Sequence, residues 1–407
     1  MFDRFCRLWY DMRNSHTFFK AGSIASGVQQ MVGPKDRERT GVSLFAGAGG
    51  MDVGFHAAGM RVIFANELDR DAVASYEANW PGVMRPGDIE GLLGELAACR
   101  DQAVDLVFGG PPCQGFSVAG KMDPNDKRNA LLWRFLDAVS AVMPLGFVCE
   151  NVKALGKLAK WRTVRDRFLN TAHELGYNCD FVVLNASEYG VPQGRERVFF
   201  FGSRFFPVNA ADLLARLSSY KEKAPTVREA IYHLGPAGSD RNPATCAAKV
   251  TLAAKPVLRK SPYAGMMFNG LGRPLNLDGV SATLPASMGG NKTPIVDELL
   301  LHGTNAPDWV GEYHAHLRAG GAPRELNDAP PHLRRLTLLE SAAIQTFPPA
   351  HRFEGGKSSV YRQIGNAVPC KLAHAVARAA IDVIENRPLP TLLATKGKPQ
   401  QRQLTFR

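Results

Sequence analysis

A thiol and a carboxyl group each follow an apolar run, and both are side chains of types that do chemistry. Cys113 comes after Val104–Phe108 and a break of two glycines and two prolines, and Glu150 comes directly after Leu145–Cys149. Such runs are typical of buried strands, and in an open α/β sheet ligands bind beyond the carboxyl ends of the strands. There the thiol could act as a nucleophile and the carboxyl group as a proton donor. Taken singly, each has a plainer explanation, Cys113 as a small buried residue and Glu150 as a helix cap or surface carboxylate.

Two arginines, Arg195 and Arg197, alternate in a segment that reads as extended chain. Side chains at alternate positions of a strand point the same way. A pair of guanidinium groups suits a phosphate or a carboxylate. The alternative is ordinary surface charge at an exposed edge.

The elements before Cys113 predict a nucleotide-binding βαβ unit. A strand is expected at Gly41–Phe45, a glycine turn at Ala46–Gly50, a helix at Met51–Met60, and a second strand at Arg61–Ala65 that leads to Glu67. Glycines let a backbone approach a ligand, and a carboxylate after the second strand can accept hydrogen bonds from ribose hydroxyls. The spacing is G-x-G-G, so a complete dinucleotide fingerprint is absent from the sequence. Asp88, after a third segment, could contact an adenine amino group or cap the following helix.

Later elements are expected to complete an α/β domain. A helix is predicted at Asn129–Met143 and strands at Asn178–Leu184 and Arg197–Phe201. A capping box at Thr337–Glu340 opens another helix, and Pro369 stands at the first position of the last one. Its apolar stripe comprises Leu372, Val376, Ala379 and Val383.

The texture of the sequence changes between residues 204 and 332, where glycine and proline are frequent and long amphipathic periods are few. We therefore predict a second, loop-rich domain. The expected boundaries are an N-terminal extension at 1–40, a catalytic and cofactor-binding domain at 41–203, the second domain at 204–332, a return to the first domain at 333–386, and a basic tail at 387–407.

Composition favours a folded protein with a polyanionic partner. Of the 407 residues 21% are charged, and the net charge is +11. Such an excess points to nucleic acid first and a membrane surface second, with simple solubility as the alternative. The seven cysteines form no C-x-x-C pair, which argues against a zinc site and a disulfide scaffold and fits a reducing cytoplasm. Apolar runs all fall short of membrane-spanning length.

In chain order these segments closely resemble the motifs of the DNA (cytosine-5) methyltransferases. The resemblance spans roughly residues 40 to 386. The matching segments are Ser43–Gly50, Asn66-Glu67, Gly87–Ile89, Gly110–Ser117, Glu150–Val152, Gln193–Arg197, Arg335–Pro348 and Tyr361–Pro369. Ser43 stands where the family usually has Asp, and Leu68 stands where it often has an aromatic residue.

The resemblance implies an α/β, Rossmann-like fold for an S-adenosylmethionine-dependent methyltransferase, with a smaller, loop-rich target-recognition domain. By this resemblance Cys113 attacks C6 of a flipped-out cytosine and Glu150 protonates or hydrogen-bonds N3. Arg195 touches the base carbonyl oxygen or orients Glu150, and Arg197 orients the catalytic loop or a phosphate. S-adenosyl-L-methionine is the expected cofactor, S-adenosyl-L-homocysteine the product, and no metal is required.

The resemblance also implies two sets of binding residues. The cofactor residues would be Phe45, Ala46, Gly47, Gly49, Gly50, Asn66, Glu67, Leu68, Asp88, Ile89, Pro112, Leu131, Asn366 and Ala367. The DNA residues would be Gln114, Ser117, Arg273, Thr283, Gly289, Gly290 and Lys292. The segment Val280–Thr293, here called the recognition segment, resembles the family's target-recognition core. Asn291 and Thr293 offer further hydrogen bonds to base edges or phosphates, and Asn269, like Arg273, could reach neighbouring bases.

Rival functions fit the sequence less well. A nicotinamide oxidoreductase would leave Cys113 and Glu150 unexplained, and a catalytically silent DNA-binding paralogue would have lost one of them. A transfer-RNA methyltransferase on this fold would lack so large a recognition region. We expect a cytoplasmic, monomeric modification enzyme that acts on double-stranded DNA, away from any membrane, within a restriction–modification system. A separately encoded restriction endonuclease is its candidate partner.

Overall fold

A seven-stranded sheet is the centre of the computed structural model, which describes residues 38–112, 130–303 and 306–389. All strands run parallel except β8, which is antiparallel to both of its neighbours. Across the sheet lie β3 (Met84–Pro86), β2 (Met60–Glu67), β1 (Arg39–Leu44), β4 (Leu106–Gly109), β5 (Gly146–Val152), β8 (Glu196–Ser203) and β6 (Asn178–Asn185). Strands buried on both faces read as continuous apolar runs, which is why these segments stand out in the sequence.

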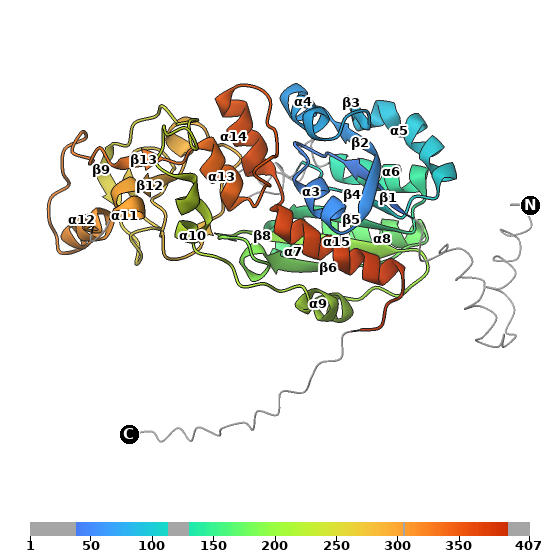
Figure 1. Ribbon diagram of the computed structural model, residues 1–407. Helices are drawn as coiled ribbons and strands as arrows, with labels where there is room; N and C mark the ends of the chain where they lie inside the picture. Colours follow the sequence, from blue (N-terminus) through green and yellow to red (C-terminus); the bar gives the residue numbers. More distant parts are fainter. Residues whose placement is uncertain (1–37, 113–129, 304–305, 390–407) are drawn as a thin grey trace, which may run out of the picture. The chain divides into compact units, whose positions relative to one another are not determined.

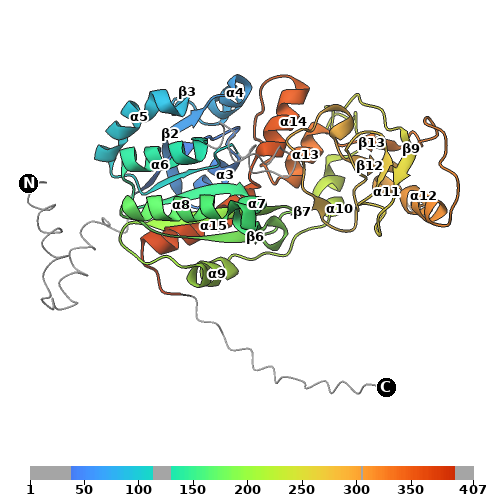
Figure 2. The ribbon, with the colours of Figure 1, turned by 180° about the vertical axis from the view of Figure 1, so that it is seen from behind.

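Helices cover both faces of the sheet, as opposite views show (Figures 1 and 2). One face packs against α3 (Gly50–Ala57), α4 (Arg70–Asn79), α9 (Ala210–Ser218) and α15 (Cys370–Ile384). The other packs against α5 (Ile89–Ala98), α6 (Ala130–Val142), α7 (Lys153–Lys157) and α8 (Arg162–Glu174). At Gly54 a Cβ would lie 2.4 Å from the backbone nitrogen of His374, so glycine permits the close approach of α3 to α15.

The strand order reverses between β1 and β4, which lie side by side although β2 and β3 separate them in sequence. At such a switch point the loops after the two strands turn to opposite faces and leave a crevice at the carboxyl edge. The glycine turn follows β1 and the Gly-Pro break follows β4. The fold therefore brings both predicted segments to one crevice.

The second half of the protein, which runs from α10 to α14 (residues 227–366), is built from short elements (Figure 1). Its strands are β9 (Leu252–Val257), β10 (Met266–Phe268), β11 (Ser281–Ala282), β12 (Ile295–Asp297) and β13 (Leu333–Arg335). Its helices are α10 (Val227–Ile231), α11 (Glu298–His302), α12 (Trp309–Arg318), α13 (Leu338–Ile344) and α14 (Lys357–Asn366). β11 pairs in parallel with β7 (Gln193-Gly194), which precedes β8, so this ladder joins the recognition segment to the sheet domain.

Packing shifts two of the predicted domain boundaries. Leu213 and Leu217 of α9 are buried in the core of the sheet domain. The boundary at residue 204 therefore falls too early. Conversely, α13 and α14 are buried with α10 and Leu284 in a cluster of the second half, so the return to the sheet domain is completed only by α15.

The predicted helices and strands are present with small shifts at their ends. The capping box is confirmed, since Thr337 accepts from the Glu340 backbone and Glu340 accepts from that of Thr337. Pro369 is the N-cap of α15, one position earlier than predicted. Glu150 lies inside β5 and does not follow it. The predicted N-terminal extension, apart from residues 38–40, and the basic tail beyond residue 389 lie outside the described residues.

Candidate functional site

The glycine turn after β1 is fixed by Glu67 at the end of β2. Oε2 of Glu67 accepts from the backbone N–H of Gly47 at 2.8 Å, and Oε1 accepts from those of Leu68 and Asp69. Gly47 has φ +57°, and a Cβ there would meet nothing within 4 Å. Phe45 also lies in the left-handed region, with φ 54°, which is strained for a bulky residue and is characteristic of functional sites. The turn is thus held in one shape, and the space beside Gly47 is open.

His351, which was not predicted from the sequence, stabilises the glycine turn through a hydrogen bond to its backbone. Nε2 of His351 donates to the carbonyl of Ala48 at 2.9 Å, and its ring packs against Trp80 and Phe347. Burial lowers the pKa of His351 to about 4, so the ring is neutral at neutral pH. At Gly49 a Cβ would lie 2.3 Å from the Trp80 ring. Gly49 is therefore required for packing.

Two further predicted cofactor residues lie at strand ends, Asn66 near the end of β2 and Asp88 just after β3. Nδ2 of Asn66 donates to the carbonyls of Arg85 and Gly87, which ties β2 to β3. Asp88 caps α5 by accepting from the backbone of Glu90. The capping role proposed for Asp88 is confirmed, and its side chain also borders the cavity described below.

The loop after β4 begins beside Glu150. Asn151, the next residue of β5, donates through Nδ2 to the carbonyl of Pro111 at 3.2 Å. A Cβ at Gly110 would lie 2.8 Å from Oε2 of Glu150. The glycine therefore leaves the space that the carboxyl group occupies.

Glu150 forms its ion pair with Arg197, whose Nε lies 2.9 Å from Oε1. The two side chains are 13% and 16% exposed. Burial raises the pKa of Glu150 above its ordinary value, although the positive charges of Arg197 and Arg195 act against this rise. The expectation of a raised pKa agrees with this geometry. Of the two arginines it is Arg197 that contacts the carboxyl group directly, whereas the sequence assigned the orienting of Glu150 to Arg195.

Arg195 is buried and its guanidinium group bridges backbone segments. It donates to the carbonyls of Leu284, Gly365 and Asn366 at 3.1–3.2 Å. Leu284 belongs to the recognition segment, and Asn366 is a predicted cofactor residue. Arg195 thus lies where both halves meet.

A cavity of about 1270 Å³ opens at this edge of the sheet. Glu150 borders this cavity together with seventeen other predicted residues. They are Phe45, Ala46, Gly47, Gly50, Asn66, Glu67, Leu68, Asp88, Ile89, Pro112, Leu131, Asn366 and Ala367 from the cofactor set, Arg195 and Arg197 from the catalytic set, and Thr283 and Lys292 from the DNA set. Gly49 does not border it.

The remaining predicted DNA residues lie on the recognition side. Arg273 is exposed and borders no part of the cavity. Gly289 and Gly290 have φ of 110° and 68°, so this turn needs glycine. Cys113, Gln114 and Ser117 lie outside the described residues.

Two hydrogen-bonding residues proposed for DNA are used internally. The amide of Asn269 donates to Thr251 and to the carbonyl of Leu252. Thr293 is fully buried, and its hydroxyl accepts from the backbone of Gly289. Both side chains maintain the loops, and the complete burial of Thr293 keeps it from reaching DNA in this arrangement.

Some residues at the cavity were not predicted. Leu271 is 60% exposed although it is apolar, and Lys153 and Arg362 place positive charge at the rim. Leu271 lies between two glycines, which was the available signal. Lys153 forms an ion pair with Glu196, and Arg362 forms one with Asp69. The partners lie far apart in the sequence, so the sequence alone does not indicate these contacts.

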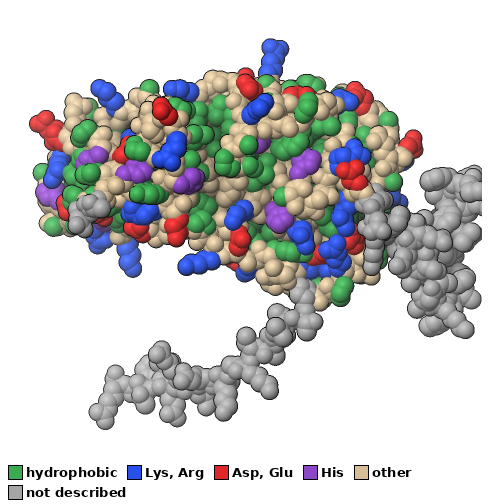
Figure 3. Space-filling model, in the orientation of Figure 1, with side chains coloured by type: hydrophobic (Ala, Val, Ile, Leu, Met, Phe, Trp, Pro, Cys, Tyr) green, Lys and Arg blue, Asp and Glu red, His purple; other side chains and the backbone are tan. Residues whose placement is uncertain are grey.

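Charge on the described surface is mixed. In Figure 3, Lys and Arg side chains are interspersed with Asp and Glu. Most of the excess positive charge of the sequence falls in residues 1–37, 113–129 and 390–407. Over the described ranges, no three His, Cys, Asp or Glu side chains gather in a way that could hold a metal ion. Every helix in those ranges is too short or too polar to span a bilayer.

Sequence comparison finds relatives along most of the chain. A sequence model of the family described as C-5 cytosine-specific DNA methylase matches residues 40–382. The chain is 30% identical over 362 residues to the Type II methyltransferase M1.HphI of Haemophilus parahaemolyticus, covering 85% of this chain and 88% of that protein. It is 35% identical over 250 residues to the Type II methyltransferase M.AquIA of Picosynechococcus sp., covering 56% of this chain and 100% of that protein.

Solved structures share the fold. A putative DNA modification methyltransferase encoded within a prophage (E. coli) matches with a TM-score of 0.58 at 22% identity, covering 85% of this chain and 99% of its own. The S. pombe Dnmt2 methyltransferase matches with a TM-score of 0.58 at 16% identity, with the same coverage. At these identities the likeness concerns the arrangement of helices and strands alone.

Proposed function

Because the chain belongs to the family of C-5 cytosine-specific DNA methylases, we propose that it methylates C5 of a flipped-out cytosine through a covalent adduct with Cys113. The observation that carries this proposal is the buried Glu150–Arg197 pair at the cavity that the glycine turn and Glu67 also border. A proton donor and a nucleotide-binding turn then face the same space. Cys113 is the residue after Pro112, which borders that space too.

The chemistry requires a nucleophile because C5 of cytosine belongs to an aromatic ring. The thiolate of Cys113 adds to C6, the ring electrons move toward N3, and C5 gains enamine character. C5 then takes the methyl group. Removal of the C5 proton lets the electron pair expel the thiolate from C6, which restores the aromatic ring.

Glu150 supplies the proton that N3 needs as electrons arrive. A carboxyl group donates only when it is protonated, and burial raises the pKa of Glu150 in that direction. Arg197 holds Oε1, which leaves Oε2 on the side of Gly110 to meet the base. Arg195, buried against three carbonyls, positions the loops around the pair.

The residues at the other end of the cavity suit S-adenosyl-L-methionine. Glu67 offers carboxylate oxygens for ribose hydroxyls, Leu68 is 67% exposed and offers an apolar surface for a flat base, and the turn at Gly47 is open. This donor set fits a nucleoside carrying an amino acid. When bound, the cofactor supplies an electrophilic methyl group and leaves as S-adenosyl-L-homocysteine. Asn366 and Ala367 border the same cavity and would complete the site.

Double-stranded DNA is the proposed substrate, and its target base must leave the stack to reach C6. Thr283 and Lys292 border the cavity, and Arg273 is exposed nearby in sequence on the same half. Arginine to guanine is the commonest specific base contact, whereas Lys292 suits a phosphate. Gln114 and Ser117 would approach the DNA with the loop that carries Cys113.

We propose further that the enzyme is the modification member of a restriction–modification system, as its Type II relatives are named. A separately encoded restriction endonuclease would be its partner. Bisulfite sequencing of DNA from a host that expresses only this protein tests the function. Protected cytosines should occur at one short sequence and disappear in the Cys113→Ser variant. Uniform conversion of every cytosine would refute the proposal.

A further inference from the structure

Gln193 and Gln345 form a pair of side-chain amides that both halves of the protein bury completely. Nε2 of Gln193 donates to Oε1 of Gln345 at 2.8 Å. Gln193 belongs to β7, and Gln345 is the C-cap of α13. They lie 152 positions apart in the sequence.

The pair continues at both ends into the backbone. Oε1 of Gln193 accepts from the N–H of Leu284 at 2.9 Å. Nε2 of Gln345 donates to the carbonyls of Ile364 at 2.6 Å and Ala367 at 3.1 Å. One end offers only a donor and the other only acceptors, so the orientation of both amides is determined. We call these hydrogen bonds the glutamine relay.

The surroundings of the relay leave little freedom for either end to move. Thr283 donates through its hydroxyl to the carbonyl of Gly194 at 3.1 Å, and Ser281 pairs with Gln193 in the β7–β11 ladder. A Cβ at Gly365 would lie 2.3 Å from the carbonyl oxygen of Pro285. The recognition segment is therefore in direct contact with the end of α14.

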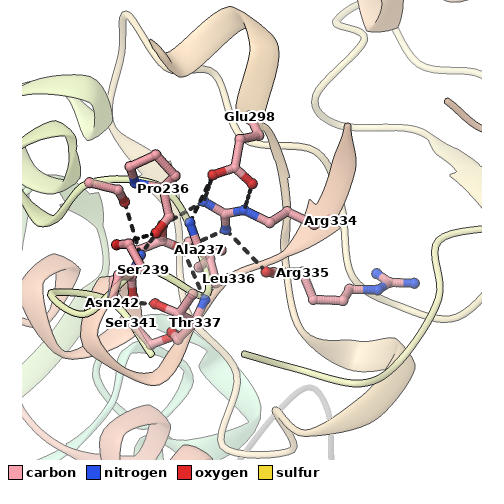
Figure 4. A network of polar contacts seen from close by, with 12 residues as sticks. Pro236, Ala237, Ser239, Asn242, Glu298, Arg334, Arg335, Leu336, Thr337 and Ser341 are labelled. Atoms are coloured by element: carbon pink, nitrogen blue, oxygen red, sulfur yellow. Dashed lines mark hydrogen bonds and ion pairs between the residues drawn. The ribbon is translucent and has the colours of Figure 1, made fainter. Parts of the chain in front are cut away.

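The opposite end of α13 is fixed to the second half by an ionic network (Figure 4). Arg334 pairs with Glu298 of α11 and with the fully buried Glu340, which also forms the capping box. Glu298 accepts in addition from the backbone of Ala237 at 2.8 Å. The N-terminal end of α13 is therefore bonded through Arg334 to α11, and its C-terminal end is bonded through Gln345 to β7. In this way α13 connects the two halves of the protein.

We propose that Gln193 and Gln345 are positioning residues, which hold the recognition segment in register with Asn366–Ala367 at the cavity. Contact with the correct DNA sequence then aligns the target base with the reactive groups. This inference rests on the proposed function, since it concerns how sequence choice reaches the reaction. It adds two residues that touch neither the base nor the cofactor.

Methionine at these positions tests the relay because it keeps the length of glutamine without a donor or acceptor. Gln345→Met leaves Nε2 of Gln193 without its partner, and the effect should reach Leu284, which bonds to Gln193 and not to Gln345. Hydrogen exchange of the Leu284 amide should accelerate about tenfold or more, the range expected for an unsatisfied buried polar group. The ratio of kcat/KM for the target sequence to that for a sequence changed at one base should fall by a similar factor in both single variants.

The double variant separates a relay from two independent contacts. Removing both amides leaves fewer unpaired groups than the single changes imply, so its loss should be smaller than the product of the two single losses. Multiplicative losses would overturn the pairing. Binding of S-adenosyl-L-homocysteine, measured by calorimetry, should weaken most in Gln345→Met, whose carbonyl partners include that of Ala367.

Gln363→Met is the matched control. Gln363 is also buried and borders the cavity, but its side chain accepts from the hydroxyl of Ser75 at 2.6 Å and donates to the carbonyl of Glu354, so it bonds to neither glutamine of the relay. This change should lower the melting temperature but leave the discrimination ratio and Leu284 exchange as in the parent. Unchanged Leu284 exchange in Gln345→Met would overturn the relay, and an unchanged ratio would overturn its positioning role. A parent that methylates no cytosine would instead refute the proposed function, and Leu284 exchange would still test the relay.

Discussion

Replacing Glu150 by glutamine separates proton donation from structure at the reactive site. Glutamine keeps the shape and can still accept from Arg197, whose Nε lies 2.9 Å from Oε1. It cannot pass a proton to N3. General acid catalysis contributes about 10²–10⁴-fold, so kcat should fall by that factor, or about 3–5 kcal/mol in activation free energy.

Stability should respond differently to glutamine and alanine at this position. Glu150→Ala leaves Arg197, only 16% exposed, without its partner, and breaking such a buried pair costs about 3–5 kcal/mol. Glu150→Gln preserves a hydrogen bond and should cost clearly less. A loss of turnover in Glu150→Gln with a near-parental melting temperature would therefore have a chemical cause.

The dependence of kcat on pH tests the acid role of Glu150 independently. Burial raises the pKa of Glu150, and only the protonated form donates, so parental kcat should fall as pH rises through that pKa. Arg197→Gln removes a charge that lowers this pKa, so the alkaline limb should move to higher pH. Glu150→Gln should have no such limb. Single-turnover rates with radiolabelled S-adenosylmethionine, together with DNA affinity by anisotropy, measure these effects. Parental turnover in Glu150→Gln would refute the acid role and leave the residue a structural partner of Arg197.

Three other perturbations have defined outcomes. Gly110→Ala places a Cβ 2.8 Å from Oε2 of Glu150, so it should displace the carboxyl group and lower kcat by about 10²-fold. Gly91→Ala is the control, because a Cβ there meets nothing within 4 Å, and it should leave kcat unchanged. Exchange of Met266–Pro294 for the matching loop of an enzyme with different specificity should redirect or abolish sequence choice in bisulfite sequencing, yet keep S-adenosylhomocysteine binding; methylation of the original sequence at the original rate would move recognition elsewhere. Deletion of residues 390–407 removes four basic residues and no acid. The slope of log affinity against log salt should then become shallower by about 0.9 for each phosphate that the tail neutralises. An unchanged slope would show that the tail does not contact DNA.

The sequence predicted the sheet domain well because local signals and ligand geometry coincide there. Apolar runs mark β1, β2, β4 and β5, and Glu67 follows β2 at the position that the glycine turn requires. Thirteen of the fourteen predicted cofactor residues consequently border one cavity, and the exception, Gly49, contacts the Trp80 ring instead.

What the sequence could not supply depends on contacts between distant segments. Arg195 and Arg197 have equivalent positions in an extended chain, and only the neighbouring β5 decides that Arg197 meets Glu150. Likewise Gln345 gains its partner from β7 and His351 its partner from the glycine turn. In the loop-rich half, Asn269 and Thr293 are polar residues of a kind that suits DNA, but their side chains satisfy backbone groups of loops that the sequence does not show to be neighbours.

The most direct measurement of the central claim is covalent trapping with duplex DNA in which the target cytosine is 5-fluorocytosine. After methyl transfer, fluorine at C5 cannot leave as a proton, so the thiolate cannot be expelled from C6. Mass spectrometry should find a stable adduct on the peptide that carries Cys113, formed only with S-adenosylmethionine present and absent in Cys113→Ser. An adduct on another residue, or one that persists in Cys113→Ser, would contradict the account.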